Sequence, residues 1–174
     1  MTVRLGSLVN GHMGGAQIPI DPPLCFTTPK LRLSSPLSQY QTLDLQADLA
    51  IDRFVTGLET QIQQQLVERS EELFGELYDA TKVSSMFVSY IKRSYHGDSF
   101  RVKMAKATAV FDADEQHIAD QQISVPCLLR ARVSCSQLWV MNRKMGMQLR
   151  LEQLKCYPCS NSASSSDSGF LSDT

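Results

Sequence analysis

Apolar and polar residues alternate one by one through most of the second half of the chain. Phe100, Val102 and Met104 alternate with Arg101 and Lys103, and the same period of two runs through 127–134 and 147–152. Successive side chains of a strand point to opposite faces, so this pattern predicts strands with one buried face and one wet face. We expect strands at 100–111, 123–135, 138–141 and 146–155.

The first half of the chain changes period after one strand. Alternation over 43–49 predicts a strand, and apolar residues from Phe54 to Leu66 then recur at helical spacing. We expect a helix to about Arg69 with Asp52 as its N-cap. A second helical piece is predicted from Ser70, and a third from Thr81.

Both ends of the chain differ in composition from the middle. Residues 1–24 are rich in Gly and Pro, which predicts a flexible N-terminal arm. Residues 159–174 are Ser-rich and carry too little apolar surface to fold, which predicts a disordered tail. We therefore expect one folded domain at 25–158.

Charge is divided along the chain, although the whole carries a formal net charge of only −1. From Asp44 to Asp79 there are nine acids and two bases, whereas from Lys82 to Lys155 there are twelve bases and six acids. The acidic half could be an ordinary solvated surface. The basic half places its cations on the predicted wet faces of strands, which suits a polyanion.

Single-stranded nucleic acid is the leading candidate for that polyanion, because aromatic residues stand beside the cations and could stack on bases. The alternative is that the cations form a solvated face without a ligand. Trp139, the single tryptophan, could equally be a core residue. The candidate binding residues are Tyr90, Lys92, Arg93, Tyr95, Arg101, Lys103, Lys106, Arg130, Arg132, Trp139, Arg143, Lys144 and Arg150.

An ordered series of short motifs resembles a known family. The motifs are Phe26-Thr27-Thr28-Pro29-Lys30, Glu72-Leu73-Phe74-Gly75, Val88-Ser89-Tyr90-Ile91-Lys92, Phe100-Arg101-Val102-Lys103, Leu138-Trp139-Val140 and Met145-Gly146-Met147-Gln148-Leu149. Over residues 25–157 they resemble the OB-fold single-stranded-DNA-binding proteins of large eukaryotic DNA viruses, Polinton-like elements and phages. The resemblance implies an α+β, OB-like five-stranded Greek-key barrel with a helical insertion and disordered termini. It also implies sequence-independent DNA binding in replication or recombination.

The tail contains a second resemblance. Asp167, Ser168, Gly169, Phe170 and Ser172 lie in a DSGxxS sequence that resembles the phosphodegron read by the β-propeller F-box subunit of a cullin ubiquitin ligase. Phosphates on both serines would add charge that an Arg-lined surface could bind. A chance match in a Ser-rich tail is the alternative.

Other chemistry has weaker signals. Cys156 and Cys159 form a single C-x-x-C, which alone cannot complete a tetrahedral zinc site, although His12, His96 and Cys127 could add ligands. Two incidental thiols are the simpler interpretation. Asp112, Asp114 and Glu115 lack the EF-hand pattern and predict a hairpin turn.

No catalytic motif, cofactor-binding motif or resident metal site is expected, because the sequence contains no P-loop, GxGxxG or HExxH pattern. We also expect no secretory signal and no membrane contact. The sequence therefore predicts a non-enzymatic single-stranded-DNA-binding protein that acts with replication proteins in the nucleus or at a cytoplasmic replication site of a eukaryotic cell. The alternative is a regulatory interaction factor whose phosphorylated tail engages the ligase receptor.

Overall fold

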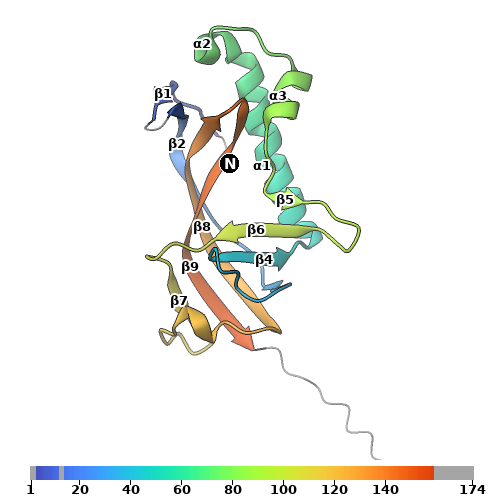
Figure 1. Ribbon diagram of the computed structural model, residues 1–174, viewed down its shortest axis with the longest axis vertical. Helices are drawn as coiled ribbons and strands as arrows, with labels where there is room; N and C mark the ends of the chain where they lie inside the picture. The colour runs from blue at the N-terminus through green and yellow to red at the C-terminus, as the bar shows by residue number, and fades with distance from the viewer. Residues whose placement is uncertain (1–2, 12–13, 159–174) are drawn as a thin grey trace, which may run out of the picture.

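The structure is a computed structural model that describes residues 3–11 and 14–158 (Figure 1). These residues form nine strands, three α-helices and a 3-10 helix at Asp120–Gln122. The strands are β1 (Val9–Asn10), β2 (Ala16–Thr27), β3 (Leu31–Arg32), β4 (Thr42–Gln46), β5 (Ile91–Lys92), β6 (Ser99–Lys103), β7 (Ala109–Phe111), β8 (Cys127–Met141) and β9 (Lys144–Pro158). The helices are α1 (Leu49–Glu68), α2 (Ser70–Phe74) and α3 (Ala80–Met86).

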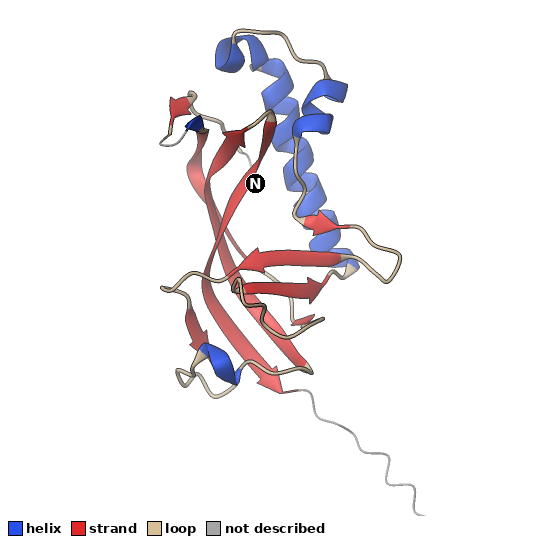
Figure 2. Cartoon of the chain, viewed as in Figure 1, coloured by secondary structure: helices blue, strands red, loops and turns tan. Residues whose placement is uncertain are grey.

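The strands form two sheets. The larger has the order β1-β2-β8-β9-β7, with β3 also paired to β8, and the smaller has the order β4-β6-β5. Antiparallel β2, β8 and β9 make a long ribbon that the smaller sheet crosses, with α1, α2 and α3 toward one end and a 3-10 turn near β7 at the other (Figure 2). An isolated bridge between Leu33 and Leu45 joins the two sheets.

The core lies between the ribbon, the smaller sheet and α1. Phe100 from β6 and Leu129 from β8 are completely buried, as are Leu43 and Leu45 from β4. The predicted alternation is confirmed on β8, where residues 127, 129, 131, 133 and 135 are all buried. The cations between them are therefore left on the outer face.

The helical insertion lies between β4 and β5. Helix α1 starts earlier than expected, because the Asp48 carboxylate caps it by accepting a hydrogen bond from the Ile51 N–H at 2.8 Å. The prediction that Asp52 is the N-cap was wrong: Asp52 lies within the first turn. Helix α2 ends at Gly75, whose φ of 73° suits a residue without a side chain.

The N-terminal segment is not a loose arm, contrary to the prediction for residues 1–24. Ile18, Ile20 and Leu24 are buried on β2, and Val3 and Leu5 are buried beside α1. The glycines and prolines concealed this alternation in the sequence. The register with β8 shifts between Pro19 and Leu24, so the prolines 22 and 23 fall where the ladder is interrupted.

Two predicted strand boundaries also differ. The expected strand 100–111 is divided into β6 and β7, whereas 123–135 and 138–141 form one strand, β8, with a register shift between Cys135 and Leu138. The α+β class, the OB-like arrangement and the helical insertion are confirmed.

The predicted disordered tail, 159–174, lies outside the described residues. Among the described helices, none combines the length and the apolar character that a membrane span requires.

Candidate nucleic-acid interface

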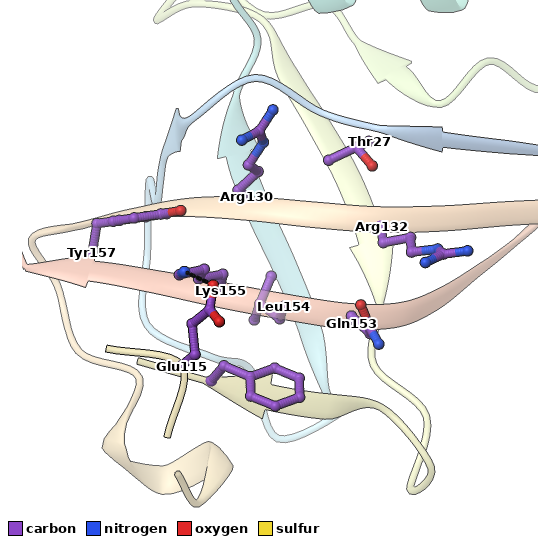
Figure 3. Close-up of a pocket in the computed structure, with 9 residues that line it drawn as sticks. Thr27, Glu115, Arg130, Arg132, Gln153, Leu154, Lys155 and Tyr157 are labelled. Carbon is purple, nitrogen blue, oxygen red and sulfur yellow. Dashed lines mark hydrogen bonds and ion pairs between the residues drawn. The ribbon is translucent and has the colours of Figure 1, made fainter. Parts of the chain in front are cut away.

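The outer face of β8 and β9 carries the clearest candidate site. Arg130 and Arg132 alternate with buried residues of β8, and they pair in register with Lys155 and Gln153 of β9. These side chains line a shallow groove of about 620 Å³, shown in Figure 3. We call it the Arg130 groove, lined by Thr27, Phe111, Glu115, Arg130, Arg132, Gln153, Leu154, Lys155 and Tyr157.

Tyr157 gives the Arg130 groove an aromatic side chain that the sequence analysis missed. The Lys30 ammonium lies 3.9 Å from the centroid of its ring, and Lys155 lies 5.7 Å away. The ring is half-buried and lines the groove. Continuing the outward alternation of Gln153 and Lys155 by two residues would have found it, but the expected strand ended at 155.

The cations of the Arg130 groove differ in their partners. The Lys155 ammonium lies 2.9 Å from a Glu115 carboxylate oxygen, and this hydrogen bond raises the pKa of Lys155 and lowers that of Glu115. Arg132 lies 3.8 Å from Glu152. Arg130 has no carboxylate partner among the described residues, and its Nε donates to the Thr28 carbonyl at 3.4 Å. Arg130 is therefore the guanidinium best placed to bind an added phosphate.

A second hollow surrounds Trp139. It measures about 200 Å³, and we call it the Trp139 pocket, lined by Val88, Ser89, Tyr90, Lys92, Arg101 and Trp139. A Cβ built on Gly146 would lie 3.1 Å from the indole ring and 3.1 Å from the Val88 carbonyl oxygen. The ring therefore packs over the bare backbone of Gly146, which leaves Trp139 half-buried.

The partial burial of Trp139 agrees fully with neither alternative, because a core residue would be buried and a stacking ring would be exposed. Its neighbour Tyr90 is committed to the fold: the Tyr90 oxygen accepts from the Leu149 N–H at 3.3 Å, and burial raises the pKa of its phenol. The backbone N–H of Tyr90 donates to the buried Glu59 carboxylate at 2.8 Å. Glu59 of α1 therefore holds the Tyr90 side of the Trp139 pocket in place, and the indole of Trp139 lines the same pocket.

Two of the predicted cations are already paired with acids. Arg93 lies 2.7 Å from Asp52 and 2.5 Å from Asp98, and Arg101 lies 2.6 Å from Asp44. These bonds raise the pKa of both arginines, and Arg93 lowers that of Asp52. The division of charge along the sequence therefore does not separate these charges in space, because β4 and α1 bring acids alongside the basic strands.

The remaining predicted residues are dispersed. Lys103 and Lys106 line a separate hollow of about 650 Å³ with Tyr40. Tyr95 is fully exposed on the loop between β5 and β6. Arg150 is exposed on β9 opposite Ser134, on the same face as Arg132. The predicted set thus occupies several surfaces rather than one.

Arg143 and Lys144 lie at the turn that joins β8 to β9. They line a cleft of about 560 Å³ against α3. The Lys144 ammonium donates to the Ser85 carbonyl at 2.8 Å. Asn142, Arg143 and Lys144 are all exposed, and Lys144 already belongs to β9.

The minor candidates are placed as follows. Asp112 accepts hydrogen bonds from the N–H groups of Asp114 and Gln116, both at 2.9 Å, and so forms a turn. An antiparallel bridge between Phe111 and His117 closes this turn, so the predicted hairpin turn is confirmed. Burial raises the pKa of Cys156 to about 12, which disfavours its thiolate. No group of three potential metal ligands occurs within residues 3–11 and 14–158, and Cys159 and the DSGxxS sequence lie outside them.

Comparison with solved structures identifies two phage proteins of similar fold. The single-stranded DNA-binding protein from bacteriophage Enc34, in a C-terminally truncated form, aligns with a TM-score of 0.52 and 10% identity over 90% of this chain and 96% of its own. The gp2.5 protein, a single-stranded DNA-binding protein encoded by bacteriophage T7, aligns with a TM-score of 0.51 and 12% identity over 84% and 98%. No protein-family model and no curated protein sequence matches the chain. The predicted resemblance to phage single-stranded-DNA-binding proteins is thereby confirmed at the level of the fold.

Proposed function

We propose that this chain binds single-stranded DNA, without enzymatic activity, through the outer face of the ribbon formed by β2, β8 and β9. The observation that carries the proposal is the Arg130 groove, which combines Arg130 with an aromatic ring that lines the same hollow. A cation can hold the phosphate backbone, while a ring can stack on any base. The fold, which resembles that of two phage single-stranded DNA-binding proteins, supports the same assignment.

Single strands fit this surface better than duplex for a physical reason. Stacking on Tyr157 or Trp139 requires a base whose face is exposed, and bases in a duplex are already stacked. The contacts involve backbone phosphates and ring faces rather than base edges, so we expect little sequence preference.

The test is a binding titration with single-stranded DNA, duplex DNA and single-stranded RNA at two salt concentrations. The parent should prefer single strands, and its affinity should fall steeply with salt. Replacing both Arg130 and Arg132 by Glu should weaken binding strongly while the circular dichroism spectrum is unchanged. Arg53→Glu is the matched control, because Arg53 is an exposed cation on α1, away from the groove. A folded double variant that binds as tightly as the parent would contradict the proposal.

The biological setting that follows from this function is DNA replication or recombination, with replication proteins as partners. Coating of exposed single strands would place the protein in the nucleus or at a cytoplasmic replication site. A viral origin belongs to the same proposal. Location of the protein at sites of DNA synthesis would test it.

A second candidate function concerns the tail. The sequence Asp167-Ser168-Gly169-Phe170-Leu171-Ser172 supports binding of a cullin ligase receptor after phosphorylation of both serines, because each phosphate adds about −1.5 to −2 charge. A synthetic peptide covering 164–174 should capture the receptor only when doubly phosphorylated. Equal, negligible capture by both forms would leave the sequence as a coincidence.

A further inference from the structure

The turn between β8 and β9 holds an arginine where the backbone favours glycine. Asn142 has a φ of 51° and Arg143 a φ of 58°, both in the left-handed region. Two-residue hairpin turns of this kind favour Asn followed by Gly, because a side chain at the second position is strained. The geometry of the turn therefore does not account for Arg143.

Arg143 lines the cleft between this turn and α3, which we call the turn cleft, lined by Glu76, Tyr78, Lys82, Ser85, Met86, Asn142, Arg143 and Lys144. Lys82 is neutralised there by Glu76 at 3.1 Å. Lys144 is held by a carbonyl oxygen, which leaves its charge uncompensated, and Arg143 has no partner among the described residues. The turn cleft thus carries excess positive charge on an exposed arginine.

The aromatic ring in the turn cleft already has two close neighbours. Tyr78 stacks on Phe74 with ring centroids 5.0 Å apart, and the Lys82 ammonium lies 3.7 Å from its centroid. Phe74 is already stacked on Tyr78, so a base would compete with it for this ring, whereas Tyr157 has cations beside it but no stacked ring among the described residues. The turn cleft is therefore suited to a phosphate rather than to a base.

We propose that the turn cleft is a second phosphate-binding site for the same single strand, and that it sets the length of strand the protein covers. This inference rests on the proposed function. Arg130 and Arg143 are separated by about 40 Å of strand, at about 3.3 Å per residue. Trp139 lies between them on β8, so a bound strand would run from the Arg130 groove past the Trp139 pocket to the turn cleft.

The strain at Arg143 provides the experiment. Arg143→Gly should raise the melting temperature by about 2–4 °C, because it relieves the left-handed strain. The same substitution should weaken binding of an oligothymidylate of about 20 nucleotides several-fold, and leave one of about 5 nucleotides unchanged. The salt dependence for the longer strand should lose about 0.7 from its log–log slope, the value for one phosphate contact.

Arg143→Lys is the matched control, since it keeps the charge and should retain most of the affinity for the longer strand. Opposite changes in stability and affinity would separate a binding role from a structural one. If Arg143→Gly binds the longer strand as tightly as the parent, or weakens both lengths equally, the inference is wrong. The first result would leave the turn cleft to an acidic protein partner. If the parent binds neither oligonucleotide, the proposed function itself fails.

Discussion

Two outer surfaces of this molecule carry arginines on strands whose exposed and buried residues alternate. The two surfaces differ in the residue that lies opposite each arginine on the neighbouring strand. On β6, Arg101 lies opposite Asp44 of β4 and forms a salt bridge of 2.6 Å. On β8, Arg130 lies opposite Lys155 of β9 and has no described carboxylate partner. Alternation thus predicts which side chains are exposed. The neighbouring strand decides which of them can bind a new anion.

Trp139 lines the same pocket as Arg101 and stands on the same strand as Arg130, so its removal should have the largest effect on binding. Trp139→Ala should lose about 1–3 kcal/mol of binding free energy for single-stranded DNA, the typical value for one base–aromatic stack. Tryptophan fluorescence of the parent should be quenched on titration with oligonucleotide. Stability should fall by less than the roughly 3–5 kcal/mol typical of a fully buried ring.

The opposite pattern would change the comparison. Trp139 is a core residue if Trp139→Ala unfolds the protein and the fluorescence of the parent does not change on adding DNA. The binding surface would then be confined to the Arg130 groove.

A matched pair of arginine substitutions tests the comparison directly. Arg130→Ala should weaken binding several-fold and reduce the log–log salt slope by about 0.7, because one phosphate contact is lost. Arg101→Ala should change affinity by less than about twofold, since its charge is already balanced by Asp44. Titrations at several salt concentrations measure both values, and equal losses would show that the ion pair does not withhold Arg101 from DNA.

Glu59 gives a smaller effect, on stability rather than on binding. It is 5% exposed, and burial raises the pKa of its carboxyl while the Tyr90 N–H hydrogen bond opposes that shift. A raised folded-state pKa adds stability that is complete below the unfolded pKa of about 4.3 and is lost as the pH rises through the folded value. Glu59→Gln should therefore be more stable than the parent at neutral pH and equal to it in acid. Denaturant unfolding at pH 4 and pH 7 measures the difference, and a destabilised Gln variant at pH 7 would show that the carboxylate is needed for the Tyr90 hydrogen bond.

The sequence predicted those features that depend on local periodicity. The buried face of β8 and the approximate extent of α1 follow directly from the spacing of apolar residues. The N-terminal strand was missed because prolines 19, 22 and 23 interrupt the buried positions 18, 20 and 24. The ion pairs of Arg93 with Asp52 and of Arg101 with Asp44 join residues 41 and 57 positions apart, and no local pattern specifies that pairing.

The proposed binding site was predictable in the same limited sense. Arg130 and Arg132 were identified because both stand on one alternating strand. Tyr157 was within reach of the same alternation, but its contact with Lys30 joins distant segments, and the strain at Arg143 depends on the turn type. Both are properties of the assembled fold.

The pairing of β2 with β8 has a consequence for how the protein is made. Phe26 lies opposite Val133, so a strand near the start of the chain pairs with one near the end of the described residues. Closing so long a loop slows folding, because its entropy is lost before the contacts form. During synthesis β2 lacks its partner strand until β8 has left the ribosome. We therefore expect DNA binding to appear late in translation, and chains arrested before β8 to be prone to aggregation.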